Sequence, residues 1–270
     1  IKISENSLTL KKGNFYIKQD LIIPYDLIIN PGVKIFLDPK KSILVKGNLD
    51  INGIEEEVII SNSQPNKPFG VFAILGNNKS NVKINNLLLT GGSDDIIDGN
   101  FFIGALSIYH HQNVEIINSS INKNFGDDGL NIKNSNVKIY NNIFSNNFAD
   151  GVDLDFCKGI VKKNNFIFSD GIDSSSKDQN GDGLDLSGSH IQVENNLFKN
   201  FLDKASSVGE KTNAIFINNL FQDNFSAITG KDSSIIYLIS NKYINNKSKI
   251  DLFRKKQLFN EPKLYNFNDE

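Results

Sequence analysis

The sequence has a single cysteine and no methionine or tryptophan. One cysteine, Cys157, excludes an internal disulfide framework, and it leaves the compartment open because many secreted bacterial chains also lack disulfides. No apolar run reaches the length of about 18 residues that a transmembrane helix needs. The chain begins at Ile1 and contains no Met, which indicates a processed or excised piece that can have lost a targeting signal.

An excess of one charge is also missing. The chain has 29 Lys and Arg against 31 Asp and Glu, a net charge of -2, and the two signs are interspersed. This balance gives no electrostatic reason to expect a nucleic acid or a membrane surface as partner. A length of 270 residues suits one all-β domain, and no composition shift asks for a second one.

The sequence does contain a repeat. An Asn (once Ser), any residue and a large apolar residue recur in steps of 33, 23, 22, 32, 23 and 22 residues. A second strand signal, such as Gly-Leu-Asn at 129–131, keeps the same period. Two strand signals per turn of about 22 residues predict an all-β fold, a single-stranded right-handed parallel β-helix, which is a solenoid. The first residues of the repeat are Asn86, Ser119, Asn142, Asn164, Asn196, Asn219 and Asn241.

The Asn repeat itself predicts structure, because an Asn side chain at a sharp corner can bond the backbone of its own or the next coil and form a ladder. Residues 1–246 are predicted to form the β-helix, with early coils over 1–70 and regular coils over 71–246. Residues 247–270 lack the repeat and are predicted to fold over the last coil as a cap or tail.

Two long steps of the repeat carry insertions, at 91–102 and 169–180. Both precede a Gly-initiated strand, so we expect both to project from the same side of the β-helix, three coils or about 14 Å apart. Two such walls would flank a groove, which is a usual place for a binding site.

The floor of this groove follows from strand alternation. With Leu130, Val152 and Leu184 facing the core, every second residue points outward. The alternation predicts that Asp153 and Asp185 lie ~5 Å apart on neighbouring strands, and Asp153 and Asp155 ~7 Å apart along one strand. The predicted rows are Ser107, Asn131, Asp153, Asp185, Ser207 and Thr229, and beside them Tyr109, Lys133, Asp155, Ser187, Gly209 and Lys231.

Carboxylates so close are unstable together unless one is protonated, a cation is bound or a Lys intervenes. The short spacing suits a retaining glycosidase pair or a cation site, and the longer one an inverting pair. Asp-Gly before a strand is ordinary turn chemistry, so Asp128, Asp150 and Asp182 are interpreted as turn residues. Lys204 follows at the same position, where it is either a structural salt bridge or a general base.

Other polar residues border the same face. Tyr109 is placed to stack on a sugar, and Glu210 and Lys211 end the next strand. The candidate substrate-binding residues are Tyr109, Asn131, Lys133, Ser187, Ser207 and Glu210.

Three stretches carry a resemblance to a known family. They are Gly-Asp-Gly-Leu-Asp-Leu-Ser-Gly-Ser at 181–189, Asp-Lys-Ala-Ser-Ser-Val-Gly-Glu at 203–210 and Lys-Asp-Ser-Ser at 231–234. With the repeat, they make the chain resemble bacterial right-handed parallel β-helix repeat proteins of the pectate-lyase-like superfamily. The resemblance implies carbohydrate substrates, usually acidic polysaccharides, and often Ca²⁺. The chain departs from the patterns of this superfamily in two ways. Lyases of this shape usually use an Arg or Lys as base, but the one Arg here, Arg254, lies in the expected cap. The Asn-Thr-Asp and Arg-Ile-Lys strands of polygalacturonase-type hydrolases and the Asp-Pro-His-Asp strand of alginate epimerases are absent from the sequence.

The favoured hypothesis is a polysaccharide lyase or C5-epimerase, with Asp153, Asp155 and Asp185 holding a cation or the substrate carboxylate. Asp153 and Asp185 would be the metal ligands, and Lys204 or Lys211 the base. The alternatives are a glycoside hydrolase that uses the same Asp residues and a non-catalytic glycan- or surface-binding β-helix. Each version expects a polysaccharide or oligosaccharide partner, a secreted, periplasmic or cell-surface location, and a monomer or homotrimer.

Overall fold

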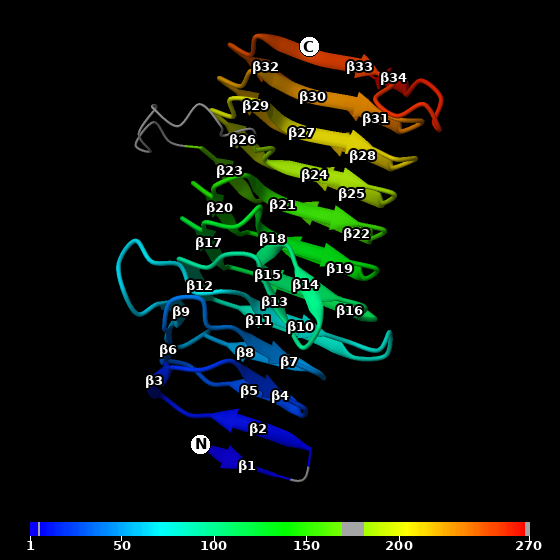
Figure 1. Ribbon diagram of the computed structural model, residues 1–270. Coiled ribbons are helices and arrows are strands. Elements are labelled where there is room, and N and C mark those ends of the chain that lie inside the picture. The colour runs from blue at the N-terminus through cyan, green and yellow to red at the C-terminus, as the bar shows by residue number, and fades with distance from the viewer. Residues whose placement is uncertain (5, 169–180, 268–270) are drawn as a thin grey trace.

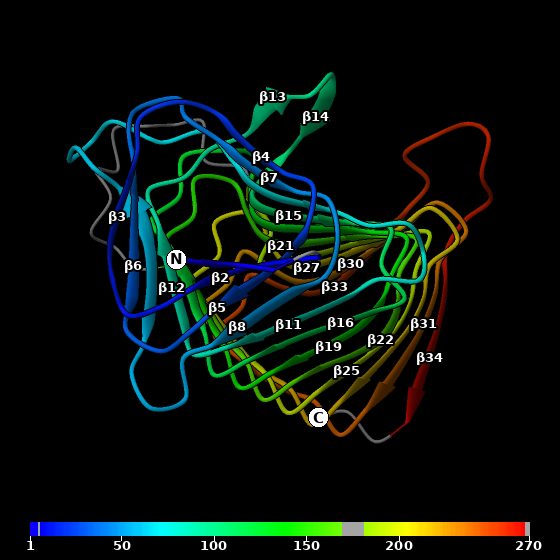
Figure 2. The ribbon, with the colours of Figure 1, turned by 90° about the horizontal axis from the view of Figure 1, so that it is seen from below.

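The computed structural model describes residues 1–4, 6–168 and 181–267. Within these ranges the chain winds as a solenoid with three long parallel faces, shown from the side in Figure 1 and along the axis in Figure 2. None of the residues in these ranges forms a long apolar helix of the kind that crosses a membrane.

Each coil contributes one strand to each of three sheets, which we call A, B and C, in the chain order B, C, A. Sheet A contains β1 (Lys2–Ile3), β2 (Ser7–Leu10), β5 (Asp26–Ile29), β8 (Leu49–Asn52), β11 (Asn81–Asn85), β16 (Asn113–Ile117), β19 (Asn136–Tyr140), β22 (Lys158–Lys162), β25 (His190–Glu194), β28 (Asn213–Ile217), β31 (Ile235–Ile239) and β34 (Lys263–Phe267).

Sheet B contains β3 (Gly13–Ile17), β6 (Val33–Leu37), β9 (Val58–Asn62), β12 (Leu87–Thr90), β17 (Ser120–Asn122), β20 (Ile143–Ser145), β23 (Asn165–Ile167), β26 (Leu197–Lys199), β29 (Leu220–Gln222) and β32 (Lys242–Ile244). Sheet C contains β4 (Leu21–Ile23), β7 (Ile43–Val45), β10 (Phe72–Leu75), β15 (Gly104–Tyr109), β18 (Asp128–Lys133), β21 (Asp150–Asp155), β24 (Leu184–Ser187), β27 (Lys204–Gly209), β30 (Ser226–Lys231) and β33 (Ser248–Phe253).

The parallel β-helix predicted from the repeat is confirmed, but each coil has three strands where the sequence analysis counted two. The strand that was missed belongs to sheet A, where short stretches such as β16 bury Val114 and Ile116 and expose the residues beside them. β33 and β34 pair in parallel with β30 and β31, so the solenoid continues beyond residue 246, where the sequence analysis placed its end.

The interior is a single apolar column of Val, Ile, Leu and Phe side chains. Aromatic rings in sheet B stack from coil to coil, with centroids 5.1 Å apart for Phe144 and Phe166 and 4.6 Å apart for Phe166 and Phe198. Like side chains therefore fall on like side chains, which fixes the register in which neighbouring coils stack.

The Asn ladder predicted at a corner is confirmed between sheets A and B. The backbone N–H of Asn142 donates to Oδ1 of Asn164 at 2.9 Å, and that of Asn164 donates to Oδ1 of Asn196 at 2.8 Å. Asn141, which precedes the ladder residue, has a φ of 56°, a left-handed conformation that Asn tolerates. The ladder explains why Asn recurs with the period of the coil.

The other two corners have ladders of their own. Between sheets B and C, Asn124 donates from Nδ2 to Oδ1 of Asn147 at 3.0 Å. Between sheets C and A, the backbone N–H of Cys157 donates to Ser189 Oγ at 2.9 Å, and that of Ser189 to Thr212 Oγ1 at 3.0 Å. All three corners are therefore bonded to the next coil by side chains.

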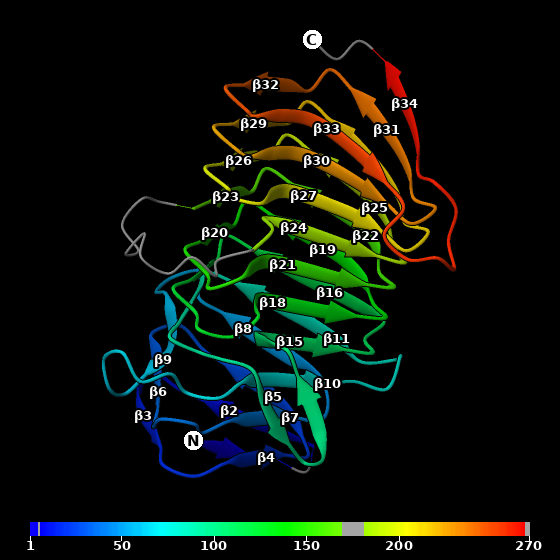
Figure 3. The ribbon, with the colours of Figure 1, turned by 45° about the horizontal axis from the view of Figure 1, so that its top comes forward.

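The insertion at 91–102 folds into a hairpin of β13 (Asp95–Ile97) and β14 (Asn100–Phe102). It lies outside the coils against the early strands of sheet C, as Figures 2 and 3 show. Phe102 stacks on Tyr109 with centroids 5.1 Å apart, and Ser42 Oγ donates to Asp95 Oδ2 at 2.6 Å. The hairpin therefore bounds one end of the outer face of sheet C, whereas the insertion at 169–180 lies outside the described residues.

Candidate functional site on the outer face of sheet C

Three columns of side chains run along the outer face of sheet C, one residue per coil in each. We call the set the acidic floor. The first column contains Asp128, Asp150, Asp182 and Lys204; the second contains Asn131, Asp153, Asp185 and Ser207; the third contains Lys133, Asp155 and Ser187.

The second and third columns are the rows that the sequence predicted, and the pairing of the strands confirms their register. Asn131 Nδ2 donates to Asp153 Oδ2 at 2.9 Å. Lys133 Nζ forms a salt bridge of 3.0 Å with Asp155 Oδ2. Strand pairing sets Asp153 directly beside Asp185.

Of the first column only Lys204 was predicted as part of the site, and its three aspartates were interpreted as turn residues. Asp128 and Asp182 are only 3% and 5% exposed, and the backbone N–H of Asp182 donates to Asp150 Oδ1 at 2.6 Å. Strand pairing joins Asp128 to Asp150 and Leu130 to Val152 but skips Gly151. Asp150 and Asp153 are therefore three residues apart and not two or four. Strict alternation counted from Asp153 therefore passes over Asp150, although both residues contribute to the same acidic floor.

Burial raises the pKa of several of these carboxyl groups. The pKa of Asp128, of Asp150 and of Asp153 lies well above its ordinary value, first because of desolvation and then because neighbouring carboxylates repel the charge. Burial also raises the pKa of Asp182 to about 6, although the Lys204 ammonium opposes this rise. The acidic floor therefore binds protons at a pH where an isolated Asp has lost them.

Several buried atoms of the acidic floor lack a hydrogen-bond partner among the described residues. They are Asp128 Oδ2, Asn131 Oδ1, Asp185 Oδ1 and Ser207 Oγ. Three of the four can only accept, since an amide oxygen and a carboxylate oxygen carry no proton unless the carboxyl is protonated. A buried acceptor without a donor is costly, so the acidic floor suits a ligand that brings cations, protons or hydroxyl groups.

A divalent cation is one group that these residues fit. One carboxylate oxygen each of Asp150, Asp182 and Asp185 lies within 4.8 Å of the others, and oxygen donors are what Ca²⁺ prefers. The sequence predicted Asp153 and Asp185 as ligands, and this group shares only Asp185 with that prediction. The buried Asp185 Oδ1 has no hydrogen-bond partner among the described residues, so it is free to bind a cation. Calcium binding stays a prediction.

The sequence of residues 104–264 matches a family described as the right handed beta helix region. The chain belongs to this right-handed β-helix family. A comparison with curated proteins found no match for it.

Two solved structures resemble this right-handed β-helix in outline. An alginate lyase from Paenibacillus sp. str. FPU-7 has a TM-score of 0.41 and 12% identity, over 89% of this chain and 93% of the lyase. The Streptococcus pneumoniae surface protein and adhesin PfbA has a TM-score of 0.27 and 13% identity, over 90% of this chain and 92% of the adhesin. At these identities neither likeness says what this β-helix binds.

Lys204, one of the two predicted bases, is committed to ion pairs in this β-helix. Its Nζ donates to Asp182 Oδ1 at 3.1 Å and to Asp203 Oδ2. Although burial lowers the pKa of Lys204, its carboxylate partners raise it further, so the amine keeps its proton. This geometry favours the structural salt bridge over the general base.

Lys211 and Glu210 do not reach the acidic floor. Both have left-handed φ values, 65° and 53°, in the corner that follows β27. Lys211 Nζ lies 5.9 Å from the centroid of Phe259, and Glu210 forms an ion pair with Lys256. Their side chains therefore contact the segment after β33, and the acidic floor ends before them.

Tyr109 is also placed differently from the prediction. Its ring is 8% exposed, because Phe102 stacks on it and Lys133 Nζ lies 5.3 Å from its centroid. Its hydroxyl accepts from the backbone N–H of Ile103 at 3.3 Å. Tyr109 anchors the hairpin and has no open face for a sugar. Alternation alone could not show this, because the covering residues come from the insertion.

Proposed function

We propose that this β-helix is a carbohydrate-active enzyme whose active centre is the acidic floor. The observation that carries the proposal is the gathering of six aspartates, two of them buried and four partly buried, with only two lysines among the described residues of the acidic floor, together with acceptor atoms that have no donor among these residues. The arrangement costs the fold desolvation and repulsion that neutral side chains of similar shape would avoid. Sugar hydroxyl groups are donors that these acceptors can use.

Acid–base chemistry by pairs of carboxyl groups fits the acidic floor best. Desolvation keeps a proton on some of the carboxyl groups, and such a group can protonate a leaving oxygen while an ionised neighbour acts as base or nucleophile. One carboxylate oxygen each of Asp150, Asp182 and Asp185 lies within 4.8 Å of the others. This distance is close to the ~5 Å that separates the two carboxyl groups of retaining glycosidases. A glycoside hydrolase is therefore the reaction class we favour.

A lyase or C5-epimerase that acts on an acidic polysaccharide is the second candidate, and the group of Asp150, Asp182 and Asp185 is what supports it. A divalent cation bound there would neutralise the uronate carboxylate and make the proton beside it easier to remove. The chain must then supply a base. Since Lys204 is held in two ion pairs, a carboxylate such as Asp153 is the better placed group.

A polysaccharide substrate also implies a location for the enzyme. Such polymers are met outside the cytoplasm, so a secreted, periplasmic or cell-surface position belongs to the same proposal. The direction of the columns supports it, since they follow the solenoid axis and can contact successive sugars of one chain.

The test is a panel of neutral, acidic and amino polysaccharides incubated with the whole chain. Hydrolysis predicts new reducing ends without ultraviolet absorbance, and elimination predicts reducing ends together with the absorbance of an unsaturated ring. Binding without any product would contradict the enzymatic proposal and identify a glycan-binding protein. If no member of the panel were bound or changed, the carbohydrate proposal itself would fail.

A further inference from the structure

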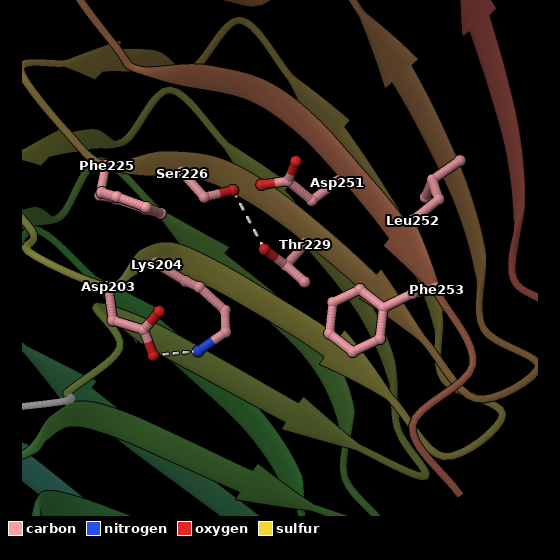
Figure 4. A pocket seen from close by; sticks show the side chains of 8 residues that line it. All are labelled: Asp203, Lys204, Phe225, Ser226, Thr229, Asp251, Leu252 and Phe253. Carbon is pink, nitrogen blue, oxygen red and sulfur yellow. Dashed lines mark hydrogen bonds and ion pairs between the residues drawn. The ribbon is translucent and has the colours of Figure 1, made fainter. Parts of the chain in front are cut away.

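A pocket of 460 Å³ lies beyond the last aspartate of the second column, towards the C-terminal end of sheet C. Its size lies within the range of small-molecule sites, roughly 300–1,000 Å³, and can hold a sugar ring. Figure 4 shows that it is built by residues of β27, β30 and β33 and by the corners that precede the first two strands. Its lining includes Asp203, Lys204, Phe225, Thr229, Asp251 and Phe253.

The pocket continues the acidic floor. Strand pairing sets Asp185 beside Ser207, Ser207 beside Thr229, and Thr229 beside Asp251. A glycan that follows the second column therefore reaches Asp251 three coils beyond Asp185. The inference below rests on the proposed function for this reason.

The pocket contains one carboxylate, that of Asp251, without an ion-pair partner among the described residues. The Lys204 ammonium already forms ion pairs with Asp182 and Asp203. Asp251 Oδ1 accepts from Ser248 Oγ at 2.8 Å, and no described Lys or Arg forms a salt bridge with this carboxylate. A partly buried carboxylate with a neutral partner is best completed by a cationic donor.

Aromatic rings flank this carboxylate. Phe225 and Phe253 are 47% and 43% exposed, so both rings offer apolar surface to a ligand. The Nζ of Lys247 lies 4.3 Å from the centroid of Phe225, so this ring already contacts an ammonium group. Carboxylate and ring faces together form the combination that recognises an organic ammonium ion.

We propose that this pocket is a subsite for a sugar that carries a protonated amino group. The ammonium donates to Asp251, and the apolar face of the sugar ring lies against Phe253. An N-acetylated sugar of the same shape leaves Asp251 without its cation. A uronate is repelled by Asp251, although Lys231, at the end of β30, is a cation that forms no salt bridge among the described residues.

The experiment compares three hexasaccharides by isothermal titration calorimetry at mildly acidic pH with the whole chain. They are β-1,4-linked glucosamine, its fully N-acetylated counterpart and α-1,4-linked galacturonate. We expect glucosamine to bind about tenfold more tightly than the N-acetylated hexamer, the strength of one charge-assisted hydrogen bond. Asp251→Asn should reduce that ratio to near one.

The matched control is Asp50→Asn, which removes the same charge from an exposed position of β8 on sheet A. It should leave the ratio unchanged, because a long-range effect of net charge would move both variants equally. Equal binding of the charged and N-acetylated hexamers, tighter binding of galacturonate, or equal effects of the two variants would each overturn the subsite. If glycans are cleaved while the ratio is one, only the subsite fails; if no glycan is bound or cleaved, the proposed function fails as well.

Discussion

Asp150 accepts, at 2.6 Å, the backbone N–H of Asp182, the residue that occupies its own position one coil later. One carboxylate of the acidic floor thereby holds the backbone that carries the next. Substitution of Asp150 would remove a structural bond as well as a charge. No backbone N–H of the described residues donates to Asp153 or Asp185, and these two are the better residues with which to test chemistry.

Asp153→Asn and Asp185→Asn should each reduce turnover of the glycan found by screening by about 100-fold or more, as expected when a general acid or base is lost. The amide keeps the shape of the side chain but cannot exchange the proton. Initial rates measure the effect, and circular dichroism shows that the fold is retained. Asp50→Asn, on the other side of the β-helix, should keep the wild-type rate, and full activity in both floor variants would contradict the assignment.

Asp128→Asn should stabilise the protein at pH 8 and leave its stability almost unchanged at pH 4. The folded state binds the Asp128 proton more tightly than the unfolded chain does, since burial raises its pKa well above 3.8. Wild-type stability from this group is therefore complete below about pH 4 and is lost as the pH rises. The neutral amide has no proton to lose. Thermal unfolding at both pH values measures the difference, and an equal shift at pH 4 and pH 8 would show that the effect is not electrostatic.

Calcium should raise the melting temperature at pH 7 and bind with measurable heat, because an ion among Asp150, Asp182 and Asp185 offsets their repulsion. Asp185→Asn should weaken binding by at least about tenfold, since it removes one of few charged ligands. Asp155→Asn is the control, because Lys133 already neutralises that carboxylate. Absence of both heat and thermal shift would exclude the ion and leave protons as the compensating charge.

Asn164→Ala should destabilise the protein by about 3 kcal/mol, because the buried amide bonds the coils on both sides. Its Nδ2 donates to Ile139 O and to Asn196 Oδ1, both at 3.0 Å, and its Oδ1 accepts from the Asn142 backbone at 2.9 Å. Asn113→Ala, at an exposed position with one bond to Asn81, should cost less than about 1 kcal/mol. Urea unfolding followed by circular dichroism measures both, and similar losses would mean that the ladder is not special.

The repeat predicted the fold and two of the three columns because one period of sequence equals one coil. Counting residues therefore places Asp153 beside Asp185 without any knowledge of coordinates. The aspartates of the first column were missed because Gly151 breaks the alternation between Asp150 and Asp153, and Asp-Gly before a strand was interpreted as a turn. Regular counting succeeds along the solenoid axis and fails where a strand departs from its period of two.

The second limit of the sequence-based prediction was burial by segments that are distant in the sequence. Tyr109 and Asn131 both point away from the core as predicted, yet the first is 8% exposed and the second 0%. Tyr109 is covered by the hairpin, whose path depends on the contacts of Phe102 and Asp95. No periodic pattern describes an insertion, so its influence on the site had to come from the structure.

The segment that contains the hairpin is also bonded to the coils at both of its ends. Before it, the backbone N–H of Gly92 donates to Asn124 Oδ1 at 2.9 Å, and after it, the backbone N–H of Gly104 donates to Ser107 Oγ at 3.1 Å. Since both bonds belong to the coils, the residues between them can change in number and kind while the stack stays in register. The β-helix thus offers an exchangeable module beside its acidic floor, where evolution or an engineer can alter ligand preference by replacing one loop.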